Sequence, residues 1–258
     1  MKFLKLTFCA LSLILLASCN SLSFDEQEYY EYRVYKIDSE DKQQQVMKFL
    51  RMAYVPAMYR MGLSRIGVFV NAKKNDDYDI HMILPFNGMG QYAGRSEYLM
   101  NDRVFMDDAA VFFGSSKDNP PYLRIDSSFF KAFSSMPFIE MPEESLRDKK
   151  RIFELRVYES HNDEKAALKR DMFNVDGETQ LMRDLGMGPV FFAECLSGKN
   201  YPNLTYMLSA SSLEENKAYW QNFLQSPRWA KMKQIEKYKG TVSKIEKKFL
   251  KPVDFSEL

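Results

Sequence analysis

The chain has 258 residues, of which 45% are hydrophobic and 14% aromatic, and its 36 Lys and Arg almost balance its 35 Asp and Glu. This balance argues against nucleic-acid binding, which needs a strongly basic face. The apolar content is ample for a packed core.

The N-terminus has the pattern of a bacterial lipoprotein signal. Lys2 and Lys5 form a short basic region, and an apolar run too short to span a membrane ends at Leu16-Ala17-Ser18-Cys19. This ending resembles the lipoprotein cleavage box, in which the Cys is acylated and becomes the first mature residue. We therefore expect a signal peptide at 1–18, a lipid anchor on Cys19 that holds the protein to a membrane of the bacterial cell envelope, and a tether at 19–28. The alternative is an ordinary secretory signal in which Cys19 is incidental.

Cysteine usage excludes an internal disulfide on this interpretation. Cleavage removes Cys9 and acylation blocks Cys19, so Cys195 is the only thiol left. Cys195 lies in an apolar strand pattern, and we expect it to be a small core residue rather than a nucleophile.

Residues 29–136 are predicted to form a first structural unit. An alternating strand at 30–37 is followed by Asp38-Ser39-Glu40-Asp41, which supplies the N-cap of a helix that Pro56 kinks or ends and Gly62 stops. The remaining elements are two strands, a helix and a closing strand, at 66–70, 78–84, 91–113 and 122–133.

Residues 151–258 are predicted to repeat this order after a linker at 137–150, where two prolines and a charge run lie together. The expected elements are a strand, a helix, two strands, a helix broken at Ser226-Pro227 and a last strand, at 151–159, 163–185, 189–195, 203–209, 213–233 and 241–250.

The two units share a sequence motif. Phe153-Glu154-Leu155-Arg156-Val157-Tyr158 repeats Tyr30-Glu31-Tyr32-Arg33-Val34-Tyr35, and internal repeats of this kind indicate one unit made twice. Each unit has the βαββαβ order of a ferredoxin-like fold, which leaves one sheet face bare. We therefore predict an α+β protein in which the two bare sheets pack together as an intramolecular barrel, so that one monomer forms a pseudo-dimer.

The second unit resembles a NIPSNAP domain. The resemblance rests on the opening motif at 153–158 and on a set of later residues: Gly186, Phe191-Phe192-Ala193-Glu194, Asn203-Leu204, Tyr219-Trp220 and Ser226-Pro227-Arg228-Trp229. The first unit looks like a diverged copy. This family is in the dimeric α/β barrel group, and the resemblance implies the same barrel. The group also includes cofactor-independent monooxygenases and haem-degrading proteins.

Strand alternation suggests a set of residues inside the barrel. If the apolar faces of the opening strands cover helices, the opposite faces point into the lumen, and His81 points there by the same alternation. The predicted ligand-binding residues are Arg33, Tyr35, His81, Arg156, Tyr158 and Tyr206, with Tyr206 as the repeat counterpart of His81. Such a lumen would receive a small acidic or aromatic ligand. The alternative is that Glu31 and Glu154 simply pair with the arginines and fill the barrel.

No metal or cofactor is expected. His81 and His161 are the only histidines, and no HExxH or CxxC spacing occurs. The leading hypothesis is a lipid-anchored, non-catalytic module that binds a small ligand or a partner. The alternatives are a monooxygenase-like or haem-degrading-like enzyme, which only the family resemblance implies, and a purely structural envelope protein. An open lumen favours binding or catalysis, and a filled lumen favours structure.

Overall fold

The computed structural model describes residues 27–73, 77–141 and 151–258. The predicted signal peptide, Cys19, most of the tether and residues 142–150 of the linker lie outside these ranges. In the described part of the chain, no helix is both long and apolar enough to cross a membrane.

The first repeat follows the predicted βαββαβ order. Its elements are β1 (Tyr29–Lys36), α1 (Glu40–Phe49), the π-helical turn η1 (Leu50–Tyr54), α2 (Val55–Arg60), β2 (Gly67–Asn71), β3 (Ile80–Phe86), α3 (Met89–Asn101), α4 (Arg103–Phe113) and β4 (Arg124–Ala132). Ser39 caps α1, its hydroxyl accepting from the backbone N–H of Lys42. The π-helical turn directly precedes Pro56, which lacks the N–H of a regular helix, and the helix continues to Arg60 rather than ending at the proline.

The second repeat has the same order. Its elements are β5 (Ile152–Glu159), α6 (Asp163–Asn174), α7 (Glu178–Asp184), β6 (Pro189–Ser197), β7 (Asn203–Ala210), α8 (Leu213–Gln225), α9 (Pro227–Met232), the 3-10 turn η2 (Glu236–Tyr238) and β8 (Lys244–Pro252). The predicted break at Ser226-Pro227 separates α8 from α9, and the Ser226 side chain caps α9.

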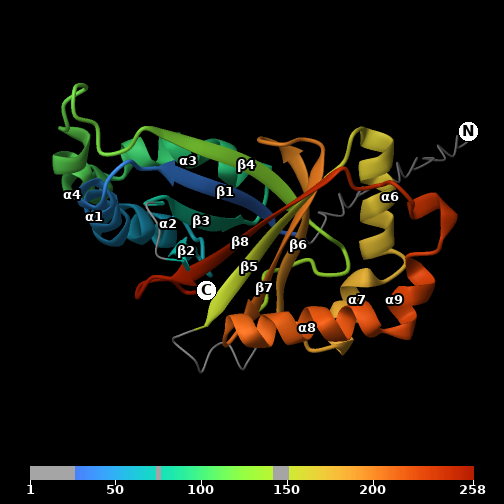
Figure 1. Cartoon of the computed structure of the whole chain (residues 1–258). Coiled ribbons are helices and arrows are strands. Elements are labelled where there is room, and N and C mark those ends of the chain that lie inside the picture. Colours follow the sequence, from blue (N-terminus) through green and yellow to red (C-terminus); the bar gives the residue numbers. More distant parts are fainter. Residues whose placement is uncertain (1–26, 74–76, 142–150) are drawn as a thin grey trace, which may run out of the picture.

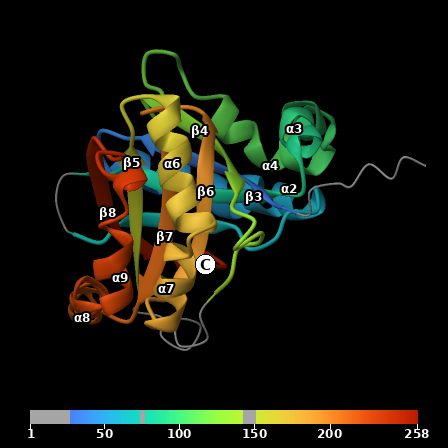
Figure 2. The same cartoon turned by 90° about the vertical axis from the view of Figure 1, so that its right-hand side faces the viewer.

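The two sheets close into one antiparallel barrel, which confirms the predicted fold. The strand order around it is β1-β3-β2-β8-β5-β7-β6-β4. The helices of the first repeat and those of the second lie on opposite sides of the barrel (Figure 1), and α6 lies in front of the strands when the molecule is turned (Figure 2).

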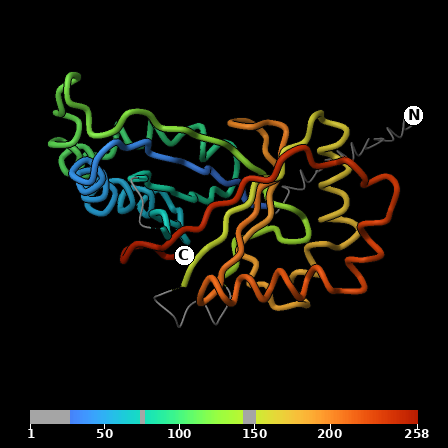
Figure 3. Tube along the Cα trace, in the orientation of Figure 1, coloured from blue at the N-terminus to red at the C-terminus, as the bar shows by residue number. Residues whose placement is uncertain are grey.

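Two seams join the repeats. At one, β4 pairs with β6. At the other, β8 runs across to β2 and pairs with Phe69–Asn71, as the tube in Figure 3 shows. The C-terminal segment extends this second seam, because Val253 and Glu257 donate backbone hydrogen bonds to the carbonyls of Val68 and Ile66.

The side-chain directions of the opening strands are the reverse of the prediction. Tyr30, Phe153 and Leu155 lie in a cluster of buried residues drawn from both repeats, which packs one end of the barrel lumen. Tyr35 and Tyr158 lie in separate clusters between the sheets and the helices. Both faces of these strands are buried, so alternation shows which residues share a face but does not show which face meets the helices.

Candidate functional site

The barrel lumen changes from apolar to charged along its length. One end is packed with side chains from the two repeats: Tyr30, Phe69, Ile83, Phe130, Phe153, Phe191, Met207 and Leu250. Moving along the same strands, the lumen-facing positions become Tyr32 and His81, and then Lys36, Asp79, Asp126 and Glu246.

A cavity of about 120 Å³ occupies this charged end. Its walls come from both repeats and include Tyr32, Val34, His81, Leu155, Val157 and Thr205. The register explains the arrangement, because Val34 of β1 is paired with His81 of β3, and Val157 of β5 with Thr205 of β7. Residues paired directly across an antiparallel ladder point to the same side of the sheet.

His81 is the main polar group in the wall of the cavity. It is fully buried, and its Nδ1 lies 2.7 Å from the Tyr32 hydroxyl. Its other ring nitrogen, Nε2, is buried and has no hydrogen-bond partner among the described residues. A buried polar atom without a hydrogen bond lowers the stability of the fold by about 1–3 kcal/mol. A small molecule that donates a hydrogen bond to Nε2 would remove this penalty.

Burial keeps His81 neutral. Desolvation, assisted by Lys248, lowers the pKa of His81 to about 4. Burial also raises the pKa of the Tyr32 hydroxyl, with added effects from Asp79 and Asp77. Both groups are therefore uncharged at neutral pH and act as hydrogen-bond donors or acceptors rather than as ions.

The charged groups at the cavity entrance form a rim, defined here as Lys36, Asp79, Asp126, Lys199, Glu246 and Lys248. Most of these charges are matched. Lys36 pairs with Asp79, Lys199 lies 3.9 Å from Asp126, and Glu246 pairs with Lys244. Lys248 makes no ion pair within 4 Å among the described residues, and it interacts with the more distant carboxylates of Asp77 and Glu246.

Of the six predicted binding residues, only His81 lies in the lumen. Arg33, Tyr35, Arg156, Tyr158 and Tyr206 lie on the opposite strand faces, beneath the helices. The alternative prediction for the arginines is right about the pairing and wrong about filling the barrel, because Arg33 pairs with Glu31 at 3.3 Å and Arg156 with Glu154 at 2.7 Å. They do so under the helices, where α3 and α8 supply further donors to the two carboxylates.

Tyr206 is not the repeat counterpart of His81. The equivalent residue is Thr205, since His81 pairs with Val34 and Thr205 with the matching Val157. Tyr206 instead donates to the Tyr158 hydroxyl at 2.9 Å in the layer beneath the helices. The spacing between these two strands is one residue longer in the second repeat, which places Thr205 and not Tyr206 opposite Val157.

Tyr32 and Thr205 are cavity residues that the sequence prediction missed. Tyr32 lies on the strand face that was expected to meet the helices. Alternation with Arg33 would place Tyr32 in the lumen only if the whole strand were turned over. Cys195 lies in the lumen cluster, where burial raises the pKa of its thiol to about 11, and this makes it an inert core residue. Within the described residues, no three His, Cys, Asp or Glu side chains lie close enough together to hold a metal ion.

Known families and solved structures share the fold described above. Residues 153–257 match the NIPSNAP family model. No curated protein is significantly similar to the chain in sequence.

Several solved structures cover most of the chain, and two of them have the following similarity. One, from Fusobacterium nucleatum subsp. nucleatum ATCC 25586, is called a "putative monooxygenase"; it is 8% identical, covers 88% of this chain and 92% of its own, and has a TM-score of 0.55. The other has the same description and comes from Lactobacillus acidophilus NCFM; it is 11% identical, covers 88% of this chain and 94% of its own, and also has a TM-score of 0.55. At these identities the likeness shows a shared fold.

A NIPSNAP family protein from Agrobacterium tumefaciens str. C58 matches a single repeat. It is 18% identical, covers 42% of this chain and 98% of its own, and has a TM-score of 0.37.

Proposed function

We propose, from a chain whose residues 153–257 form a NIPSNAP domain, that the lumen cavity binds a small aromatic molecule and that this binding is non-catalytic. The observation that carries the proposal is His81 Nε2, a buried nitrogen without a partner among the described residues, in a side chain that lines an open cavity. A filled lumen would have favoured a purely structural role.

The chemistry of the walls defines the ligand. Val34, Leu155 and Val157 offer apolar contact, and the Tyr32 ring lies nearly parallel to the His81 ring, with an interplanar angle of 9°. Such walls suit a planar ring, and Nε2 suits one hydroxyl or carbonyl group on it. The positive charge of Lys248 at the rim also favours a ring that carries partial negative charge.

His81→Leu tests this proposal. The full chain should release a small aromatic molecule on denaturation, detected by untargeted mass spectrometry, and the variant should retain about tenfold less. Stability should change by no more than about 1–2 kcal/mol, because the variant removes the unpaired nitrogen while Tyr32 loses one hydrogen bond. Retention should be the same between about pH 6 and about pH 8, since His81 is neutral throughout.

The matched control is Tyr206→Phe, which removes a ring hydroxyl of the same barrel on the helix side and should leave retention unchanged. If the wild-type protein releases no small molecule, or if His81→Leu retains as much as wild type, the lumen is not a binding site.

One observation favours a second candidate, a cofactor-independent oxygenase. A neutral imidazole that is hydrogen-bonded to Tyr32 can accept a hydrogen bond from a phenolic substrate through Nε2 and so orient the substrate in the cavity. The structures from Fusobacterium nucleatum and Lactobacillus acidophilus, which share the fold, are also described as monooxygenases. Oxygen uptake that depends on the copurified molecule and disappears in His81→Leu would favour this function over simple binding.

We further propose that the protein is a monomer anchored to the cell envelope through Cys19. One chain supplies both halves of the barrel, so no second copy is needed to close it. Acyl chains contribute roughly 0.8 kcal/mol per buried methylene, and two or more chains give a stable anchor.

Cys19→Ser should therefore move the protein from the membrane fraction to the soluble fraction in a detergent-partition assay. Cys9→Ser is the matched control and should leave it in the membrane fraction. Continued membrane association of Cys19→Ser would show that another feature holds the protein there.

A further inference from the structure

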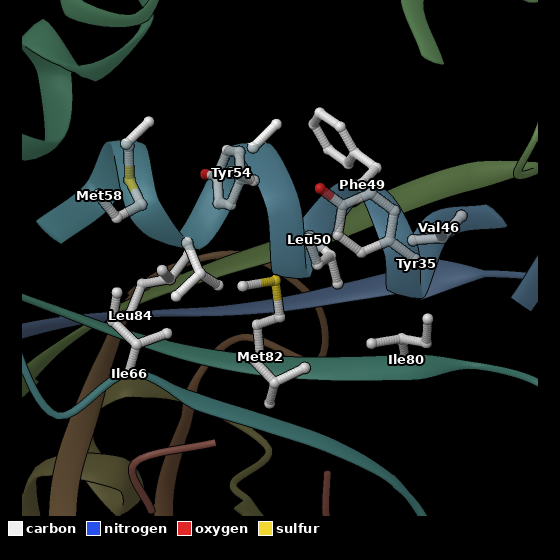
Figure 4. Packing of buried hydrophobic residues seen from close by; sticks show 14 of the residues in the cluster. Tyr35, Val46, Phe49, Leu50, Tyr54, Met58, Ile66, Ile80, Met82 and Leu84 are labelled. Atoms are coloured by element: carbon white, nitrogen blue, oxygen red, sulfur yellow. The ribbon is translucent and has the colours of Figure 1, made fainter. Parts of the chain in front are cut away.

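A second pocket lies outside the barrel, between the sheet and the helices of the first repeat. It has a volume of about 300 Å³. Arg33 and Arg95 lie at its polar end, and Phe49, Phe105 and Phe112 are among its walls. Figure 4 shows Tyr35 pointing from β1 towards the first helical segment, which carries Phe49 and Tyr54.

The polar end of this pocket carries one positive charge more than it has negative charges. The fully buried carboxylate of Glu31 accepts from Arg33 Nε at 3.3 Å, from Arg95, and from the Ser127 hydroxyl at 2.7 Å. Only 13% of the Arg33 side chain and 10% of the Arg95 side chain are exposed. Among the described residues, no acidic side chain lines the pocket, so two guanidinium groups share a single carboxylate.

The second repeat shows the same arrangement in balanced form. Glu154 accepts from Arg156 Nε at 2.7 Å, and its remaining donors are neutral: the Asn216 amide at 2.9 Å and the Trp220 indole at 2.6 Å. In the second repeat, therefore, one cation, Arg156, balances one anion, Glu154. The extra Arg95 of the first repeat is not needed to satisfy the carboxylate, because neutral groups do so in the second.

An independent observation points to a missing partner in the same place. Tyr54 is almost fully buried, and its hydroxyl has no hydrogen-bond partner among the described residues. The Arg33 guanidinium lies 5.3 Å from the Tyr54 ring centroid. Tyr54 ends the π-helical turn η1, and such turns are frequent at functional sites.

We propose that this pocket binds a monocarboxylate that carries an apolar body. The carboxylate would accept from Arg33 and Arg95 and from the Tyr54 hydroxyl, and it would neutralise the extra buried charge. A planar carboxylate matches the fork of a guanidinium group. The apolar body would lie among the aromatic walls, where Phe49 and Phe112 are already stacked with centroids 3.9 Å apart.

The test uses para-fluorobenzoate as the acid and para-fluorobenzamide as its uncharged analogue, each titrated against the full chain and followed by fluorine NMR. The acid should bind at least about tenfold more tightly than the amide, because charge-assisted hydrogen bonds are made only by the acid. Arg95→Gln should reduce the affinity for the acid to that for the amide. Arg60→Gln removes an exposed positive charge from the same repeat and should change neither affinity.

Tyr54→Phe separates binding from a structural role. It removes a hydroxyl that makes no hydrogen bond among the described residues, so the melting temperature of the unliganded protein should stay the same or rise. Affinity for para-fluorobenzoate should nevertheless fall by about threefold or more. His81→Leu should leave this affinity unchanged, which separates the pocket from the lumen cavity.

Three results would overturn the proposal: equal affinity for the acid and the amide, no binding of the acid at millimolar concentration, or a lower melting temperature for Tyr54→Phe with unchanged affinity. Weaker binding of the acid in His81→Leu but not in Arg95→Gln would also overturn it, because the acid would then occupy the lumen.

Discussion

Replacing Arg156 with Gln is expected to lower the free energy of unfolding by roughly 3–5 kcal/mol. Glu154 is 1% exposed and Arg156 only 14% exposed at the side chain, so this substitution leaves a carboxylate in the interior without its single cation. The Asn216 and Trp220 donors remain, but neutral hydrogen bonds do not replace a full positive charge. Arg156 also lies 3.5 Å from the Trp220 ring centroid, and that cation–π contact is lost as well.

The corresponding change in the first repeat provides the matched comparison. Arg33→Gln should cost less than half as much as Arg156→Gln, because Glu31 keeps Arg95 as a counter-ion. Burial alone would raise the pKa of Glu31, but Arg33 and Arg95 hold it below its ordinary value. Chemical denaturation of the two variants, followed by circular dichroism, measures the difference. Equal losses in both variants would show that the second arginine of the first repeat does not share in stabilising Glu31.

The architecture could be predicted because several features of the sequence agree. The repeated motif at 30–35 and 153–158 sets the two units in register, and the strand and helix periods place the outer ends of the elements within a few residues of the observed ones, although the helices predicted at 91–113 and 163–185 are each divided in two. Ser39 caps a helix and Ser226-Pro227 separates two helices, as expected. Each ferredoxin-like sheet has one uncovered face, and packing the two sheets together as a barrel buries both faces.

The orientation of the opening strands could not be predicted in the same way. Tyr30, Tyr32 and Val34 look like the face that should cover helices, and Glu31, Arg33 and Tyr35 look like the lining of a lumen. The structure reverses this because the helices bring Arg95, Asn216 and Trp220 to the buried carboxylates. These donors come from distant segments, and no local pattern reveals them.

The direction of the His81 side chain could be predicted because β3 shows a clear alternation of its own. Ile80, Met82 and Leu84 pack against the helices, which turns His81 to the lumen. Pairing β1 with β3 would have exposed the conflict, since directly paired residues such as Val34 and His81 must share a face. The register between paired strands therefore determines which face of β1 meets the helices, and alternation within one strand does not.

Separating the two repeats is expected to abolish folding of each half. The lumen cluster takes Tyr30, Phe69 and Ile83 from the first repeat and Phe153, Phe191 and Leu250 from the second. Phe69 and Phe153 meet across the barrel with ring centroids 5.0 Å apart. Fully burying each such side chain contributes about 1.5–3 kcal/mol, so the three from either half contribute about 5–9 kcal/mol, a large part of the roughly 5–15 kcal/mol that keeps a domain folded.

Two chains, ending at Met141 and beginning at Arg151, test this expectation. Expressed alone, each should aggregate or lack a cooperative melting transition, because its bare sheet and its seam strands are exposed. Expressed together, they should assemble into a one-to-one complex, since the β4–β6 and β2–β8 seams and the lumen cluster need no covalent connection. Phe153→Ala in the second chain should weaken that assembly, because it removes a fully buried ring from the shared core. Halves that sediment as stable monomers in analytical ultracentrifugation would mean that each repeat covers its own sheet and that the shared lumen is not what holds the molecule together.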